Sequence, residues 1–185
     1  MKLVVAITGA SGVIYAVRLL EVLKNLNVET HLIVSENAKT ILKLELNMNT
    51  DALKSLCSHI YDNNDLTAPM ASGSFQHNGM VIIPCSMKTL AGIATGYAEN
   101  LILRAADVTL KLKKPLILVI RETPYNLIHV RNMLKAMLAG AIVLPASPAF
   151  YYKPKTIDDI VNYVVGRVLD VLGLKHNLYS RWKEV

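Results

Sequence analysis

Cysteine is scarce in this chain, because its 185 residues include only Cys57 and Cys85. Two cysteines cannot build the disulfide framework of a small secreted protein, and they do not make a metal-binding set. We therefore expect both to be packed thiols, and we expect no bound metal.

Long apolar runs are also missing, although hydrophobic residues make up 52% of the chain and the mean hydropathy is +0.35. No run approaches the ~18–20 residues of a membrane span. The apolar stretch near the N-terminus is about five residues, shorter than the ~7–15 of a secretory signal. We expect a cytoplasmic protein without a membrane segment. The excess of apolar residues predicts a homo-oligomer that buries surface between subunits.

Acidic residues are outnumbered, with 14 Asp and Glu against 20 Lys and Arg and a net charge of +6. A basic protein favours anionic partners. Only Lys111, Lys113 and Lys114 approach a cluster, and no nucleic-acid-binding motif accompanies them. The charge pattern therefore favours a small phosphorylated ligand over a nucleic acid.

Repeats and linkers are absent, and apolar runs of strand length alternate with helical patterns. This alternation predicts a single α/β domain over residues 1–185, with a polar tail at 176–185. The expected fold is a Rossmann-like or flavodoxin-like sandwich around a mainly parallel sheet. The predicted strands are 3–7, 29–34, 58–61, 80–83, 116–120 and 141–144, and the predicted helices are 13–26, 36–46, 51–57, 98–113, 125–138 and 157–172.

Helical spacing also predicts which side chains are buried. In the helix at 125–138, the residues at core spacing are Met133, Leu134, Met137 and Leu138. In the last helix, Arg167 falls at the edge of the apolar stripe, so we expect it to be half-buried and to need an anion. Asp159 and Asp170 are expected to lie too far round that helix. Trp182 is expected to anchor the tail on a neighbouring surface.

The stretch LILVIRETPYN places Arg121 and Glu122 directly after a buried-type strand. In an open α/β sheet, ligands bind in the crevice beyond the carboxyl ends of the strands. Polar residues follow several predicted strands in the same way, namely Ser11, Ser35, Ser86, Lys88, Arg121 and Glu122. Their shared edge predicts a site for a phosphorylated ligand of nucleotide size.

Each of these residues also has a simpler interpretation. Arg121 and Glu122 could form an ordinary surface pair, and Ser35 and Ser86 could only cap helices. The turn TGASG at 8–12 could only make a tight connection, because it lacks the full GxGxxG spacing and the Walker lysine. The paired aspartates 158 and 159 are more typical of a helix start than of a metal site.

Several motifs together closely resemble the UbiX-type flavin prenyltransferases over nearly the whole chain. They are ITGASG at 7–12, ASGSF at 71–75, IPCSMKTLAGIATG at 83–96, RETP at 121–124, PAFY at 148–151 and VGRVLD at 165–170. The combination of IPCSMKT with RETP is specific to this family. The resemblance implies a Rossmann-like flavoprotein that forms a dodecamer with FMN at subunit interfaces.

The resemblance also implies the reaction. The family transfers a dimethylallyl group from dimethylallyl phosphate to N5 and C6 of reduced FMN, without a metal. The prenylated FMN then passes to a UbiD-type decarboxylase. By resemblance, the FMN-binding residues are Gly9, Ala10, Ser11, Ser35, Ser86, Met87, Lys88, Thr89 and Arg121. The residues around the prenyl phosphate are Lys111, Glu122, Tyr151 and Arg167. Glu45 matches a further family site residue, and the expected catalytic set is Ser11, Glu45, Lys111 and Glu122.

Elementary chemistry agrees with these roles, because breaking an allylic C–O bond builds negative charge on the leaving phosphate. Fixed cations stabilise that charge more in the transition state than in the ground state. Lys111 and Arg167 can act in this way, and Tyr151 can donate from its phenol. We assign proton transfer to Glu122 and hydrogen bonding at flavin N5 to Ser11.

Two other functions compete. FMN-dependent cysteine decarboxylases share the expected fold and cofactor, but they carry PASANT where residues 84–89 read PCSMKT, and they lack RETP. A non-catalytic flavin carrier is the second alternative. Storage of FMN would not require the charged and phenolic set of Lys111, Glu122, Tyr151 and Arg167.

Overall fold

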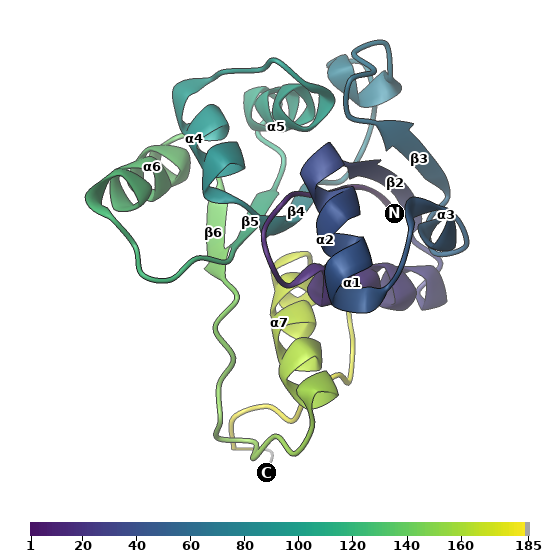
Figure 1. The fold of residues 1–185 in the computed structure, drawn as a ribbon, viewed down its shortest axis with the longest axis vertical. Coiled ribbons are helices and arrows are strands. Elements are labelled where there is room, and N and C mark those ends of the chain that lie inside the picture. Colours follow the sequence, from purple (N-terminus) through teal and green to yellow (C-terminus); the bar gives the residue numbers. More distant parts are fainter. Residues whose placement is uncertain (184–185) are drawn as a thin grey trace.

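The computed structural model describes residues 1–183, and its six strands form one parallel sheet in the order β3-β2-β1-β4-β5-β6 (Figure 1). The strands are β1 (Lys2–Ile7), β2 (Glu29–Val34), β3 (His59–Asp62), β4 (Met80–Cys85), β5 (Leu116–Ile120) and β6 (Ile142–Pro145). This order is that of the doubly wound dinucleotide-binding fold. The predicted parallel α/β sheet is confirmed, and its topology is the Rossmann-like one.

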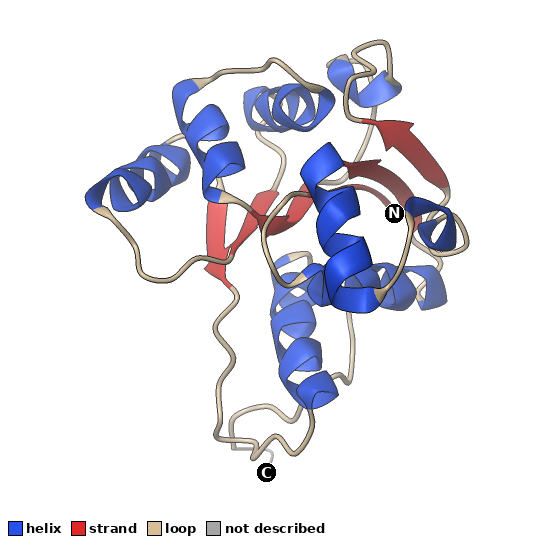
Figure 2. Cartoon of the chain, viewed as in Figure 1, coloured by secondary structure: helices blue, strands red, loops and turns tan. Residues whose placement is uncertain are grey.

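Helices cover both faces of the sheet (Figure 2). They are α1 (Val13–Asn25), α2 (Glu36–Leu46), α3 (Thr50–Leu53), α4 (Met87–Thr95), α5 (Leu101–Lys111), α6 (Leu127–Leu138) and α7 (Ile157–Val171), with a short 3-10 turn η1 (Pro69–Ala71). Among the described residues, no helix combines the length and the apolar character needed to cross a membrane.

Alternate residues of the central strands feed two separate cores, because successive side chains of a strand point to opposite faces. Leu3, Val5 and Ile7 pack with α1 and α7, whereas Val4 and Ala6 pack with α4 and α5. This two-sided burial explains why the strands read as continuous apolar runs rather than as alternating patterns.

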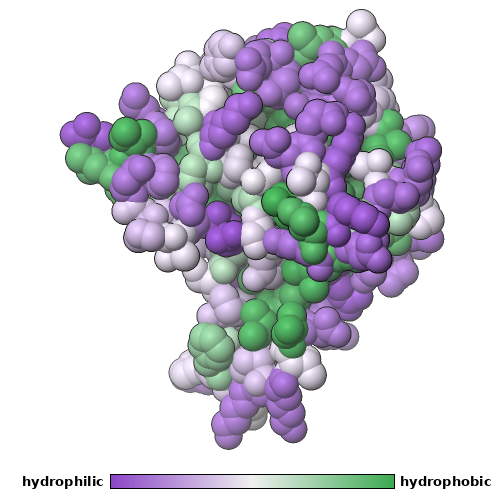
Figure 3. Space-filling model, in the orientation of Figure 1, coloured by the Kyte–Doolittle hydropathy of each residue, from purple (hydrophilic) through white to green (hydrophobic). Residues whose placement is uncertain are grey.

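The buried face of α6 differs from the prediction. Asn132 and Ala136 are its buried residues, whereas Leu134, Met137 and Leu138 are exposed. Met133 is partly buried. The helical spacing was identified correctly, but the apolar stripe at 134, 137 and 138 faces away from the core of its own chain. Figure 3 shows apolar atoms at the α6 end of the molecule. The expected packing of this stripe within the chain was therefore wrong.

The last quarter of the chain projects from the body as an arm. The segment after β6 runs outward, α7 returns towards the sheet, and the tail runs back along α7 (Figure 1). Thr156 and Asp159 form the predicted capping box at the start of α7. The ring of Trp182 lies 5.1 Å from that of Tyr151. Residues 184–185 of the predicted tail lie outside the described part of the chain.

Candidate active site

Thr8 links the ends of the two central strands at the carboxyl edge of the sheet. Its hydroxyl donates to the carbonyl of Pro84 at 2.6 Å and accepts from the backbone N–H of Ser86 at 2.8 Å. Thr8 is 2% exposed, so both bonds are shielded from water. The strand order of the sheet reverses between β1 and β4. An open α/β sheet forms its ligand crevice at such a topological switch point.

Ser35 and Ser86 cap the helices that leave this edge. The Ser35 hydroxyl accepts from the N–H of Ala38 at 3.2 Å. The Ser86 hydroxyl accepts from the N–H of Thr89 at 3.3 Å and donates to the Thr89 hydroxyl at 3.1 Å. The predicted capping role is therefore confirmed for both serines. Both also line the pocket at this edge, so capping and ligand contact are compatible.

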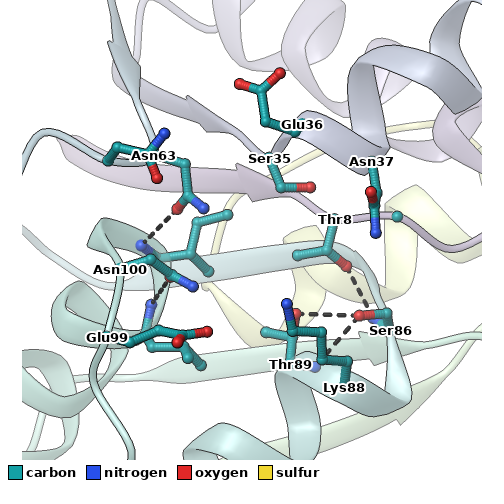
Figure 4. A pocket seen from close by; sticks show the side chains of 14 residues that line it. Thr8, Ser35, Glu36, Asn37, Asn63, Ser86, Lys88, Thr89, Glu99 and Asn100 are labelled. Carbon is teal, nitrogen blue, oxygen red and sulfur yellow. Dashed lines mark hydrogen bonds between the residues drawn. The ribbon is translucent and has the colours of Figure 1, made fainter.

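The pocket has a volume of about 390 Å³ and lies over the ends of β1, β2 and β4 (Figure 4). Five residues of the predicted set line it: Gly9, Ser35, Ser86, Lys88 and Thr89. Its other labelled residues are Thr8, Glu36, Asn37, Asn63, Glu99 and Asn100. A side chain at position 9 would collide with Asn37, so the backbone approaches closely there. The structure thus brings together residues from five segments of the chain.

Asn63 is a pocket residue that the sequence did not indicate. Its backbone carbonyl accepts from the N–H of Leu101 at 2.8 Å, and its side chain accepts from that of Ile102 at 3.1 Å. Asn100 caps the same helix, α5, through the N–H of Leu103. Asn63 lies in a long segment without periodicity, and only the chain's return to the sheet edge places it here.

Ser11 and Arg121 meet beside the pocket. The Arg121 Nε donates to the backbone carbonyl of Ser11 at 3.2 Å. Tyr15 lies close by, and burial raises the pKa of its phenol while the charge of Arg121 lowers it. Glu122 follows at the same edge and is partly exposed. The predicted meeting of the first turn with RETP is present within one chain.

The carboxylate of Glu45, a residue of α2 that only the resemblance had indicated, lies at the start of α1. It accepts from the N–H of Gly12 at 2.9 Å and from that of Val13 at 3.1 Å. An anion is favourable at a helix N-terminus, where N–H groups are unpaired. Glu45 therefore holds the glycine-rich turn that contains Ser11.

Lys111 lies at the other edge of the sheet from Arg121 and Glu122. It ends α5 just before β5 begins, whereas Glu122 follows the far end of β5. A strand of five residues spans about 16 Å. The Lys111 ammonium lies beside Gly73 of the ASGSF segment, 3.6 Å from where a side chain there would begin. One chain therefore does not bring Lys111 to Glu122.

Tyr151 and Arg167 lie together on the arm. Burial and then Tyr163 raise the pKa of the Tyr151 phenol, and the nearby charge of Arg167 lowers it by less. Arg167 is exposed and pairs with Asp170 at 3.1 Å. About half of the Arg167 side chain is exposed and it has an anionic partner, as expected, but the expectation that Asp170 lies too far round the helix was wrong. Residues three apart on a helix are neighbours, so Asp170 is well placed to serve it.

Comparison with known proteins agrees with this fold. Residues 1–169 match the Flavoprotein family, so the chain is a flavoprotein of the Rossmann-like class. It is 54% identical to the flavin prenyltransferase UbiX of Methanocaldococcus jannaschii over the whole of both chains. The chain belongs to the UbiX flavin prenyltransferase family.

Two solved structures superpose closely on the chain. AnUbiX (PadA1) in complex with FMN and dimethylallyl pyrophosphate is 44% identical, with a TM-score of 0.97 over 98% of this chain and 97% of that one. The dodecameric FMN-dependent UbiX-like decarboxylase of Escherichia coli O157:H7 is 48% identical, with a TM-score of 0.97 over 99% and 100%.

Proposed function

We propose that this protein is a flavin prenyltransferase that transfers a dimethylallyl group from dimethylallyl phosphate to reduced FMN. The observation that carries the proposal is the full-length match to AnUbiX, whose structure holds FMN and dimethylallyl pyrophosphate. The sheet-edge pocket and the RETP segment support it within this chain. Reduced FMN supplies the nucleophilic ring atoms, and the protein supplies binding, orientation and charge.

The sheet-edge pocket fits FMN in size and in chemistry. Its volume of about 390 Å³ lies within the ~300–1,000 Å³ of small-molecule sites. Hydroxyls from Ser35, Ser86 and Thr89 can donate to a phosphate, and Lys88 adds a cation. Gly9 allows the backbone to approach the ligand. We assign Ala10, Ser11, Met87 and Arg121 to the same ligand as neighbours of these segments.

The prenyl phosphate needs cations near the point where its charge grows. We assign that role to Lys111 and Arg167, with the phenol of Tyr151 as an additional donor. Each charge-assisted contact contributes roughly 1.5–3 kcal/mol, so several could replace a metal ion. Glu122 holds the proton that moves during ring closure, and Glu45 keeps the turn of Ser11 in place. Metal independence is part of the proposal.

The assembly and the recipient of the product are further parts of this proposal. The exposed apolar stripe of α6 supports a homo-oligomer, and the related protein from E. coli is a dodecamer. We propose the same assembly here, with delivery of prenylated FMN to a UbiD-type decarboxylase. Two unpaired cysteines support a cytoplasmic location.

One anaerobic assay tests the reaction. The FMN-loaded protein is reduced in a buffer that contains EDTA, and dimethylallyl phosphate or the diphosphate is then added. The mass of the released flavin is measured. We expect the flavin to gain one five-carbon unit, with no effect of EDTA. Unaltered FMN would favour a carrier or a cysteine decarboxylase. Activity that requires added Mg²⁺ would contradict metal independence.

A further inference from the structure

Asp170, on the last turn of α7, gathers four side chains around one carboxylate. Its Oδ2 lies 3.1 Å from Arg167 Nη1 and accepts from the Tyr179 hydroxyl at 2.5 Å. Its Oδ1 lies 3.1 Å from His176 Nε2 and accepts from Arg181 Nη2 at 2.8 Å. Three of the four partners come from the tail, so one acidic residue joins the tail to the arginine assigned to the prenyl phosphate.

Gly166 provides the space in which the tail packs against α7. A Cβ atom at this position would lie 2.5 Å from the Tyr179 ring and 2.8 Å from the His176 ring. Both distances are too short for any side chain, so the tail can adopt this path only because position 166 is glycine. The motif VGRVLD thus contains the space for the tail at 166, the arginine at 167 and the joining carboxylate at 170.

Aromatic contacts extend the same structure to Tyr151. The Tyr179 ring lies 4.8 Å from that of Tyr163, which in turn lies 6.3 Å from that of Tyr151 in an edge-to-face arrangement. Such pairs add to the stability of buried contacts. The tail therefore packs beside both Tyr151 and Arg167, rather than lying on an unrelated surface.

The geometry at Arg167 leaves part of its guanidinium for a ligand. Its bonds to Asp170 and Tyr179 both use Nη1. Among the described residues, Nε and Nη2 take no part in these bonds, and 49% of the side chain is exposed. A guanidinium that is held at one nitrogen loses less rotational freedom when the other two bind a phosphate.

We propose that Asp170 is a positioning residue for Arg167, and that the docked segment His176–Arg181 is a structural part of the prenyl-phosphate site. Asp170 holds Arg167 by Nη1 and directs the remaining nitrogens to the phosphate. The tail completes the set of donors around this carboxylate. The inference rests on the proposed function, because it concerns how that site binds its phosphorylated substrate.

The variant Asp170→Asn tests the inference in the full-length, FMN-loaded protein. We expect the KM for dimethylallyl phosphate to rise about tenfold, the size expected when a charge-assisted contact loses its alignment. The kcat at saturation should change less than the KM, and the Kd for FMN should be unchanged. Gly166→Ala keeps the carboxylate but displaces Tyr179 and His176, so we expect it to raise the same KM.

Glu21→Gln is the matched control, because Glu21 forms the same i,i+3 pair with Arg18 on α1. It should leave all three constants unchanged. An unchanged KM in Asp170→Asn would overturn the inference, as would equal losses in KM, kcat and FMN affinity. If Asp170→Asn does not fold, Gly166→Ala decides by the same criteria. A wild-type protein that never prenylates FMN would refute the proposed function instead.

Discussion

Thr8 shows how much one small side chain can organise at the residue scale. It follows β1 directly, and its single hydroxyl bonds to a carbonyl at the end of β4 and to the N–H of Ser86 just after that strand. Nothing in the spacing of TGASG separates this threonine from an ordinary turn residue. The partners lie 76 and 78 positions away along the chain, so only the adjacency of β1 and β4 gives the hydroxyl its role.

We expect Thr8→Val to lower the free energy of unfolding of the protein and to lower its affinity for FMN. The substitution keeps the shape but leaves the half-buried Ser86 N–H without its partner, at a cost of about 1–3 kcal/mol in the free energy of unfolding. The Pro84 carbonyl loses one of its two donors and still accepts from the backbone N–H of residue 8 at 3.3 Å. Thr8→Ser keeps the hydroxyl and serves as the control. Denaturant unfolding and FMN titration measure both effects. Equal stability of the two variants would show that the hydroxyl is dispensable.

The roles of the other site residues could be predicted from the sequence to different extents. The capping roles of Ser35 and Ser86 follow from their positions before helices, because capping depends on neighbours in sequence. Glu45 was identified as a site residue only by resemblance, since its bond to α1 crosses more than thirty positions. The pairing of Arg167 with Asp170 could have been predicted, because residues at i and i+3 share one side of a helix.

At the scale of elements, periodicity identifies helices but not what covers them. Residues 134, 137 and 138 of α6 have the spacing of a core face, yet they are exposed in the single chain. An amphipathic pattern states that a face needs an apolar partner, and that partner can be the same chain or another copy. The expectation of an oligomer and the error about the face of α6 therefore concern the same property, an apolar face that its own chain does not cover.

The tail and α7 form an element pair whose docking depends on pH. Burial raises the pKa of Asp170, but hydrogen bonds from Tyr179, Arg181 and His176 outweigh it and lower the pKa from 3.8 to about 2. A lowered pKa in the docked state means that the carboxylate form stabilises docking. The stabilisation is therefore complete above pH 4 and is lost as the pH falls through 2. It amounts to about 2 kcal/mol at neutral pH.

Trp182 reports this docking, because it is the only tryptophan of the chain and its ring lies beside Tyr151. Trp182 is 67% exposed in the docked tail, so the useful signal is its mobility rather than the position of its emission. In the FMN-free protein, we expect the fluorescence anisotropy of Trp182 to remain constant from pH 7 to pH 4 and to fall between pH 4 and pH 2. Asp170→Asn should show the lower anisotropy already at pH 7. Identical pH profiles for the two proteins would contradict the role of the carboxylate.

At the scale of the whole molecule, the sheet order explains why one chain holds only part of the proposed site. The parallel sheet and its carboxyl-edge residues follow from the alternation of strands and helices, so this part of the proposed site was predictable from the sequence. Lys111 lies at the opposite edge and Tyr151 and Arg167 lie on an arm, so the proposed site would need a second copy of the chain to complete it. The packing of copies is not encoded in the spacing of any motif.

Mixing two defective copies tests whether the site is shared between subunits. Lys111→Ala and Arg167→Ala should each be inactive alone. If Lys111 and Arg167 of one site come from different copies, random assembly of equal amounts leaves about one quarter of the sites with both residues intact. Co-expressed, differently tagged variants should therefore regain about a quarter of the wild-type rate of prenylated FMN formation. If both residues of a site came from one chain, every site would carry a defect and the mixed oligomer would stay inactive.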